Sequence, residues 1–189
     1  DNTAIIFQSE NKIKKEISFN QLYKQVSKIS KHLENINIGK NDKAAAILPN
    51  IPEAVIAMLG ATSKGIVWSS TSPDFGVDSI LDRFSQIQPK ILFVCPEYYY
   101  KGKKINIVDK INTIVNSLPS LEEVVIINYV LNPKEYNFEF NFILWNNLQS
   151  SKSELIRFTQ VNFNHPLYIM YSSGTTGKPK SIVHSSGGT

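Results

Sequence analysis

The sequence predicts an α/β fold in which a parallel sheet is flanked by helices on both faces. Short apolar segments alternate along the chain with segments of helical period, which is the order expected for β-α-β units. The apolar segments are continuous, as in strands that are buried on both faces. The 189 residues are 42% hydrophobic and 19% charged, so the chain can bury a core of this kind.

The chain opens with a predicted β-hairpin, residues 3–7 and 14–18, and continues into an amphipathic helix. Apolar residues recur there at spacings of four and three, which is the period of one helix face. These residues are Leu22, Val26, Ile29, Leu33 and Ile36. Gly39 is placed to end the helix.

Cycles of strand and helix follow. Residues 43–48 read as a short apolar strand, and Pro52 and Glu53 suit the first turn of a helix that runs toward Gly65. The next predicted elements are a strand at 66–70, a helix at 77–87, a strand at 90–95, a helix at 107–118 and a strand at 124–129. Their inward-facing helical residues are Val77, Ile80, Leu81, Phe84, Ile87, Ile107, Ile111, Ile114, Val115 and Leu118. Residues 132–164 are irregular, with one short helix around 144–149.

The most informative segment is a glycine- and hydroxyl-rich loop that ends in two lysines, Tyr171-Ser172-Ser173-Gly174-Thr175-Thr176-Gly177-Lys178-Pro179-Lys180. Glycines let backbone N–H groups approach anionic oxygens, and hydroxyl and ammonium groups add further hydrogen bonds. Apolar strands at 167–171 and 181–184 flank the loop, so it reads as a hairpin-like connection. The pattern predicts a polyphosphate site.

Two other interpretations of this loop are weaker. A Walker A loop needs four residues between its glycines and a Ser or Thr after the lysine. Here two residues separate Gly174 from Gly177, and Pro179 follows Lys178. A flexible linker would fit the composition, but not the flanking apolar strands or the Lys-Pro-Lys ending.

Composition excludes several other classes. The formal charge is only +4, and no basic stripe with interleaved aromatics indicates nucleic acid. Cys95 is the single cysteine, in an apolar run, so a disulfide framework and a cysteine-based zinc site are excluded and a buried thiol is expected. No apolar run reaches the ~20 residues of a membrane span, and no signal peptide is recognised. His32 and His165 have no metal-ligand companions in sequence, and a cytoplasmic location is expected.

The loop resembles the phosphate-loop signature of the adenylate-forming superfamily, which contains acyl-CoA synthetases, luciferases and peptide-synthetase adenylation domains. A second block narrows the resemblance: Gly65-Ile66-Val67-Trp68-Ser69-Ser70-Thr71-Ser72-Pro73-Asp74-Phe75-Gly76. Together with residues 81–90, this block is similar to the acetoacetyl-CoA synthetases. Acetyl- and propionyl-CoA synthetases usually have His at the place of Trp68 and Gly-Gly-Phe-Ser at 73–76. Lys178 stands where close relatives often have Leu.

The resemblance implies a two-step reaction of acetoacetate, ATP and CoA. A carboxylate attacks the α-phosphate of ATP to give an acyl-adenylate and pyrophosphate, and the CoA thiol then displaces AMP. Preorganised donors and Mg²⁺ would stabilise the charge in the first step. The residues implied to bind phosphate are Ser172, Ser173, Gly174, Thr175, Thr176, Gly177, Lys178 and Lys180. Thr175 and Lys180 are the implied catalytic residues, and solvated surface charge remains an alternative for Lys178.

The same resemblance implies a CoA contact in the loop after the strand at 90–95. Lys101 or Lys103 would serve where acetyl-CoA synthetases have an Arg, with a solvated basic turn as the alternative. Trp68 reads as core, with 69–75 as a positioning loop. Asp82 and Arg83 are expected to form structural ion pairs. Tyr98, Tyr99 and Tyr100 are expected to cover sheet edges. His184 follows the loop closely enough to approach a nucleotide.

Residues 1–189 are therefore expected to be a fragment of the large N-terminal AMP-binding domain, without its C-terminal lobe and inactive alone. Two rival interpretations remain. One is another short-chain acyl-CoA synthetase, acting on acetate or propionate. The other is a noncatalytic nucleotide-binding module.

Overall fold

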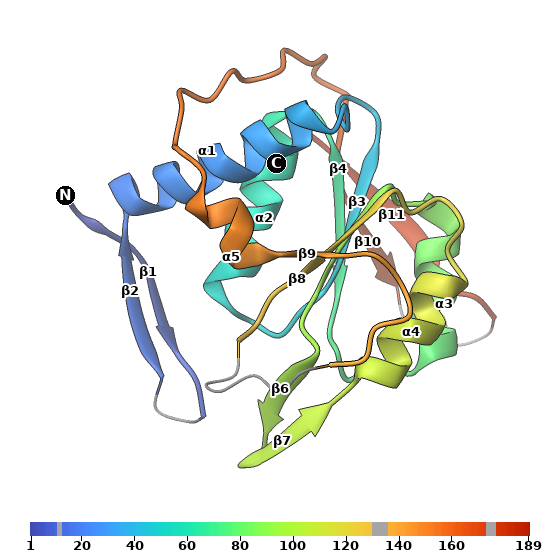
Figure 1. Ribbon diagram of the computed structural model, residues 1–189. Coiled ribbons are helices and arrows are strands. Elements are labelled where there is room, and N and C mark those ends of the chain that lie inside the picture. The colour runs from blue at the N-terminus through green and yellow to red at the C-terminus, as the bar shows by residue number, and fades with distance from the viewer. Residues whose placement is uncertain (11–12, 130–135, 173–176) are drawn as a thin grey trace.

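The computed structural model describes residues 1–10, 13–129, 136–172 and 177–189 (Figure 1). The strands are β1 (Thr3–Gln8), β2 (Lys14–Ser18), β3 (Lys43–Ile47), β4 (Val67–Thr71), β5 (Ile91–Val94), β6 (Glu97–Tyr100), β7 (Lys103–Asn106), β8 (Glu123–Ile126), β9 (Ile143–Leu144), β10 (Pro166–Ser172) and β11 (Lys180–Ser185). The helices are α1 (Phe19–Asn35), α2 (Pro52–Ser63), α3 (Val77–Ile87), α4 (Val108–Asn116) and α5 (Trp145–Ser150). None of these helices is long and apolar enough to cross a membrane.

The central sheet has the order β11-β10-β4-β3-β5-β8-β9. All neighbouring strands are parallel except β10 and β11, which are antiparallel. The predicted parallel sheet is thus confirmed, with one antiparallel edge strand added to it. The section β4-β3-β5-β8-β9 has the strand order of flavodoxin-like doubly wound sheets, in which ligands bind beyond the carboxyl ends of the strands.

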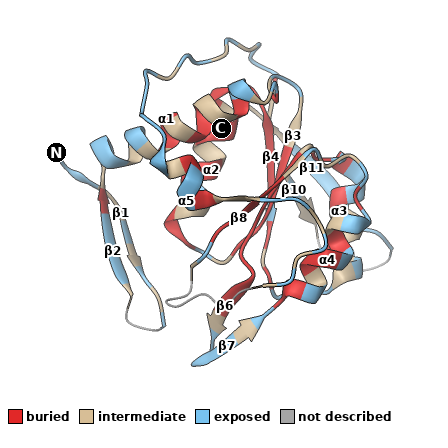
Figure 2. Cartoon of the chain, viewed as in Figure 1, coloured by how far each residue is buried: buried red, intermediate tan, exposed pale blue. Residues whose placement is uncertain are grey.

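Two apolar cores cover the two faces of the sheet. In β3, Ala44 and Ala46 pack with α1, α2 and α5, whereas Ala45 and Ile47 pack with α3 and α4. Figure 2 shows the buried strands between these helical layers. Because each residue of β3 after Lys43 meets a core, the sequence there is continuously apolar, as predicted.

Helix α1 begins as its sequence suggests and ends earlier than expected. The Ser18 hydroxyl accepts a hydrogen bond from the Gln21 backbone, and the Gln21 side chain accepts one from the Ser18 backbone, which makes a capping box. The helix ends at Asn35, and Asn37, not Gly39, takes the left-handed conformation with φ 57°. Asn tolerates this conformation better than most other non-glycine residues, so the prediction for Gly39 was wrong.

Residues 97–106 form a hairpin, β6–β7, that the sequence analysis did not anticipate. Its two-residue turn is Lys101-Gly102, with φ 51° and 72°, the positive values of a type I′ turn. The buried Glu97 carboxylate lies 2.9 Å from the Lys104 ammonium and fixes the two strands together. The tyrosines 98–100 therefore form a strand of this hairpin, and do not cover an edge of the central sheet.

Candidate functional site

The candidate site lies where β4 and β10 separate. These strands pair at one register position, Tyr168 with Trp68, and the Ser69 hydroxyl donates to the Ile169 carbonyl at 3.0 Å. Beyond this point the carboxyl end of β10 lies beside α3, where the Tyr171 hydroxyl donates to the Arg83 carbonyl at 2.9 Å. The strand thus leads the predicted phosphate loop to the flank of α3.

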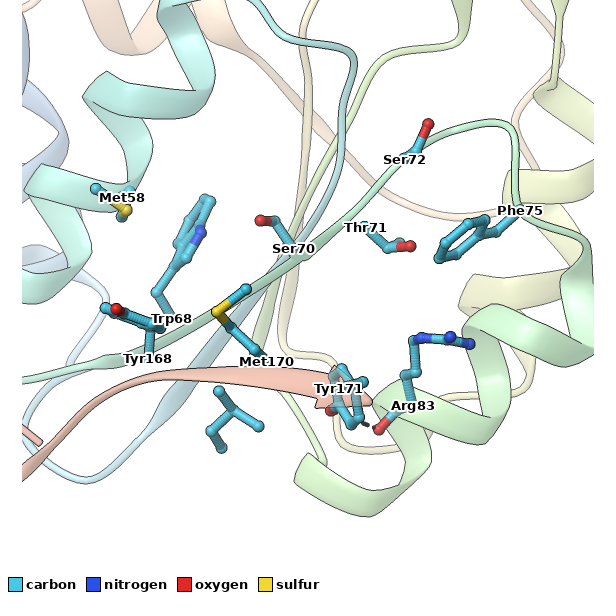
Figure 3. Close-up of a pocket in the computed structure, with 11 residues that line it drawn as sticks. Met58, Trp68, Ser70, Thr71, Ser72, Phe75, Arg83, Tyr168, Met170 and Tyr171 are labelled. Carbon is cyan, nitrogen blue, oxygen red and sulfur yellow. Dashed lines mark hydrogen bonds between the residues drawn. The ribbon is translucent and has the colours of Figure 1, made fainter. Parts of the chain in front are cut away.

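A first cavity of about 500 Å³ opens between β4 and β10 (Figure 3). Its wall is formed by side chains of α2, β4, α3 and β10 and of the segment after β4: Met58, Trp68, Ser70, Thr71, Ser72, Phe75, Arg83, Tyr168, Ile169, Met170 and Tyr171. Trp68 is only 4% exposed, so it belongs to the core as predicted and also lines the cavity. The size and the mainly apolar wall with a few polar groups are typical of a small-molecule site.

Arg83 supplies the positive charge of this cavity. Its guanidinium lies 4.8 Å from the centre of the Phe75 ring and 5.7 Å from that of Tyr171, and it donates to the backbone carbonyl of Ser79 at 2.6 Å. Among the described residues no carboxylate lies within 4.0 Å of the Arg83 guanidinium, so the structure does not show the ion pair expected for it. The aromatic rings stabilise the cation and leave its charge available to an anionic ligand.

Thr71 adds an unsatisfied polar atom between two cavities. Its side chain is 8% exposed, and within the described ranges its hydroxyl has no hydrogen-bond partner. It lines both the first cavity and a second one of about 340 Å³. A buried hydroxyl of this kind costs free energy unless a ligand or water completes it, so Thr71 indicates a polar ligand.

The second cavity lies at the carboxyl ends of β3 and β4, against β6. Its floor includes Asp74, whose carboxylate accepts hydrogen bonds from the Tyr98 hydroxyl at 2.6 Å and the Ser72 hydroxyl at 2.9 Å. The Lys110 ammonium donates to the carbonyls of Pro73 and Phe75 at 2.8 and 2.9 Å. These contacts fix residues 72–75, the part of the predicted positioning loop 69–75 that follows β4; residues 69–71 belong to β4 itself.

The described ends of the phosphate loop form a regular hairpin. Ser172 and Lys180 are register partners at the loop ends of β10 and β11. Gly177 has φ 91°, which side-chain-bearing residues rarely adopt, so a glycine is needed there. The predicted hairpin-like connection is confirmed at both ends. Ser173, Gly174, Thr175 and Thr176 lie outside the described residues.

The lysines of the loop have different surroundings. The Lys178 ammonium lies 3.8 Å from the Asp82 carboxylate, and both side chains are exposed. This confirms the ion pair expected for Asp82. Lys180 is exposed at the start of β11 and has no ion-pair partner in the part of the chain that the structure describes. His184, also on β11, stacks on Tyr168 with ring centres 4.7 Å apart.

The lysines predicted to contact CoA lie at the tip of the β6–β7 hairpin. Lys101 and Lys103 are exposed, and the Lys101 ammonium lies 5.3 Å from the centre of the Tyr100 ring. Lys104 is held by Glu97, so its charge is already paired. Tyr98, Tyr99 and Tyr100 of the same hairpin form a wall of the second cavity, which brings the hairpin tip close to that cavity.

Cys95 lies outside both cavities. It is fully buried, and burial raises the pKa of its thiol to about 12. The thiol donates to the Glu97 carbonyl at 2.9 Å. A neutral thiol in a core is a packing residue, as predicted, because the thiolate is the nucleophilic form.

Among the described residues, no group of three or more His, Cys, Asp or Glu side chains comes together as metal ligands would. His32 instead pairs with Glu123, and the His165 ring contacts the Gly65 carbonyl at 2.9 Å. The polar side chains that line the first cavity are hydroxyls and one guanidinium, and the exposed lysines 178 and 180 lie at the end of the predicted phosphate loop. These groups suit phosphate oxygens.

The fold and the site define a doubly wound α/β protein with a cavity between β4 and β10 that one arginine lines. The family described as "AMP-binding enzyme" matches residues 1–189. The chain belongs to this family.

Several acetoacetyl-CoA synthetases are similar to this chain. The chain is 44% identical over 181 residues to the protein of Xenopus tropicalis and 42% identical over 179 residues to that of Mus musculus, covering 92% of this chain in both cases. A solved structure of acetoacetyl-CoA synthetase from Streptomyces lividans matches with a TM-score of 0.90 and 36% identity over 100% of this chain. The chain spans 27% of the length of the two relatives and 28% of the solved chain.

Sequence reasoning missed three residues of the site. Arg83 was assigned to an ion pair, Tyr98 to a sheet edge, and Lys110 to no role. The sequence did contain a signal for the position of Arg83. The apolar residues of α3 define its buried face, and Arg83 lies beside that face. These apolar residues are Val77, Ile80, Phe84 and Ile87. Nothing local marks Lys110 or Tyr98, because their partners in residues 73–75 are more than twenty positions away in sequence.

Proposed function

We propose that the gene product is an ATP-dependent acetoacetate–CoA ligase, which converts acetoacetate, MgATP and CoA into acetoacetyl-CoA, AMP and pyrophosphate. The observation that carries the proposal is the block Gly65 to Gly76, whose Trp68 and Phe75 line the first cavity beside β10. In a chain 42–44% identical to named acetoacetyl-CoA synthetases, this block differs from the His and Gly-Gly-Phe-Ser pattern expected for acetate and propionate enzymes.

The first step brings a negatively charged carboxylate against the negatively charged phosphates of ATP. An acetoacetate carboxylate oxygen attacks the α-phosphorus of ATP, and the bond between the α-phosphorus and its bridging oxygen breaks to release pyrophosphate. Hydrogen-bond donors aimed at the phosphates lower this barrier because they act on charge that develops in the transition state. Mg²⁺ enters with ATP as part of the substrate, and typically stays bound to phosphate oxygens and water.

We assign the phosphate contacts to Ser172, Ser173, Gly174, Thr175, Thr176, Gly177, Lys178 and Lys180. The exposed start of β11 supports a clamping role for Lys180, since an ammonium there can reach a ligand held by the loop. The pairing of Lys178 with Asp82 supports a weaker, peripheral role for that lysine. Thr175 and Lys180 remain the proposed catalytic residues.

The second step transfers the acyl group. The CoA sulfur attacks the acyl carbonyl, the bond to AMP breaks, and the thiol proton is released. We assign the CoA nucleotide to the second cavity, with Lys101 or Lys103 at its phosphates. The position of both lysines beside the Tyr98–Tyr100 wall supports this assignment.

We also propose that residues 1–189 are part of the large N-terminal AMP-binding domain of a longer, cytoplasmic enzyme. The share of the named relatives that the chain covers, 27%, supports this view. The remaining acyl-pocket, adenine and ribose contacts would come from other parts of that enzyme.

Acid-dependent ATP–pyrophosphate exchange by the full-length gene product tests the proposal. Acetoacetate, acetate, propionate and butyrate are compared at equal concentration. We expect the fastest exchange with acetoacetate. Preference for another acid would retain the reaction and reject the substrate, and no exchange with any acid would favour a noncatalytic binding module.

A further inference from the structure

Helix α3 contacts both ends of the phosphate loop. On the β10 side, the Tyr171 hydroxyl donates to the Arg83 carbonyl at 2.9 Å. On the β11 side, the Gln86 side chain contacts both Pro179 and Ser181. The loop therefore starts and ends against the same helix.

The Gln86 carboxamide uses its nitrogen and its oxygen in these contacts. Its nitrogen donates to the Pro179 carbonyl at 3.0 Å and to the Asp82 carbonyl, one turn back in α3, at 2.6 Å. Its oxygen accepts a hydrogen bond from the Ser181 hydroxyl at 2.9 Å. Two donors meet two carbonyls and one acceptor meets a hydroxyl, so the partners fix the orientation of the amide.

The hydrogen bonds of Gln86 reach the chain on both sides of Lys180. Pro179 directly precedes Lys180, and Ser181 directly follows it, so Gln86 contacts the residue on each side of the proposed cationic clamp. Pro179 has no N–H and lies before the first residue of β11, so its carbonyl is the group through which α3 can hold this turn.

We propose that Gln86 is a positioning residue, which holds Lys180 and the end of the phosphate loop in the geometry that adenylation needs. The inference rests on the proposed function, because it assumes that the loop binds the phosphates of ATP. Gln86 itself touches no substrate. It acts through the Pro179 carbonyl and the Ser181 hydroxyl, and a displacement of about 1 Å of a positioned group can cost a reaction about 10²-fold.

The test uses three variants of the full-length gene product. Gln86→Leu keeps the approximate size and removes all three hydrogen bonds. Gln86→Glu keeps an acceptor for the Ser181 hydroxyl. It replaces the amide nitrogen with a second carboxylate oxygen, which the Pro179 and Asp82 carbonyls repel. Ser85→Ala is the matched control, since Ser85 is exposed on the same helix and, among the described residues, its hydroxyl donates to the Leu81 carbonyl within α3 and not to the loop.

We expect Gln86→Leu to raise KM for MgATP and lower kcat for acetoacetate-dependent exchange, by about 10-fold together or more, with KM for acetoacetate changed less than about 2-fold. Gln86→Glu should lose more, because it adds negative charge beside the loop. Ser85→Ala should match the unsubstituted enzyme. General damage to the protein would not change KM for MgATP more than KM for acetoacetate.

Ser181→Ala provides a second, independent measurement that holds even if Gln86→Leu folds poorly. It removes a loop-side partner of Gln86 and should raise KM for MgATP in the same direction by a smaller factor. In the double variant the two losses should be less than additive, because they share one hydrogen bond.

The outcomes separate the two proposals. An active enzyme with unchanged MgATP kinetics in both Gln86→Leu and Ser181→Ala would overturn the positioning role and leave the proposed function standing. Equal losses in Gln86→Leu and Ser85→Ala, or equal changes in KM for ATP and acetoacetate, would also overturn it. An unsubstituted enzyme that shows no exchange with any acid would overturn the proposed function itself.

Discussion

Lys178 and Lys180 stand two residues apart, yet they have different surroundings. Lys178 lies beside Asp82, whereas Lys180 begins β11 next to the loop. We therefore expect Lys180→Ala to lower adenylation about 10²-fold, because it removes charge that stabilises the transition state. Lys178→Ala should change it by less than about 3-fold, since exposed ion pairs contribute little. Single-turnover formation of the acyl-adenylate measures both, and equal effects of the two substitutions would contradict the assignment.

The buried thiol of Cys95 leads to a second prediction about a single residue. Burial raises the pKa of its thiol to about 12 from the ordinary 9.0, so the folded protein favours the neutral form. The resulting contribution to stability is fully present below pH 9 and decreases as the pH rises toward 12. We expect no alkylation of Cys95 by iodoacetamide at pH 8 in the native enzyme and complete alkylation after denaturation.

Mass spectrometry of the peptide that contains Cys95 measures the labelling, with the denatured enzyme as the positive control. Fast labelling under native conditions would show that the thiol is reactive and accessible. Cys95 would then need a role other than packing.

Sequence alone identified Cys95 as a buried residue and the loop as a hairpin-like connection, but it did not assign the ring contacts of Arg83. An arginine next to an aspartate on a helix is compatible with many ion pairs, and its real neighbours, Phe75 and Tyr171, come from distant parts of the chain. Cation–ring contacts of this kind depend on tertiary packing, which a local pattern does not contain.

At the scale of elements, the contact between α1 and α2 depends on one glycine. A Cβ atom at Gly60 would lie 2.6 Å from the Cγ2 atom of Ile29, which is fully buried. Alanine in a helix interior is usually more stable than glycine by about 1 kcal/mol. Here we expect the sign to reverse, with Gly60→Ala lowering the free energy of unfolding by about 1–3 kcal/mol through overpacking.

Denaturant unfolding of the full-length gene product, followed by circular dichroism, measures this change. Gly39→Ala is the control, because a Cβ atom there would meet nothing within 4 Å and its φ is not positive. A Gly60→Ala protein as stable as the Gly39→Ala protein would mean that the two helices can move apart at little cost.

The elements that the sequence predicted well have a clear apolar pattern, which is helical in α3 and continuous in β3 and β5. The boundaries of α3 agree with the prediction at both ends, β3 ends one residue earlier than predicted, and β5 is shorter than predicted by one residue at each end. The β6–β7 hairpin was missed because its short strands, EYYY and KKIN, contain no continuous aliphatic run like that of β5, and β-propensity alone depends on context. Only the Lys101-Gly102 pair marked its turn.

At the scale of the whole molecule, the place of β10 and β11 could not be derived from the sequence. Strand order depends on non-local pairing, and β10 joins the sheet through a single register pair with β4. That arrangement creates the first cavity and brings the loop to α3. The hairpin that carries the loop was therefore predictable, whereas the residues that surround it were not.

The proposed domain organisation leads to a last prediction. Several large apolar side chains are exposed in this chain, among them Leu155 at 86%, Phe163 at 71% and Val183 at 56%. Exposure of this extent is typical of surfaces that meet other protein or ligand. We expect residues 1–189 produced alone to bind a hydrophobic dye such as ANS strongly and to show no acid-dependent exchange, while the full-length gene product binds less dye per mole and is active. Exchange by residues 1–189 alone would contradict the proposal that catalysis needs the rest of a longer enzyme, and weak dye binding would show that these side chains are covered within the chain itself.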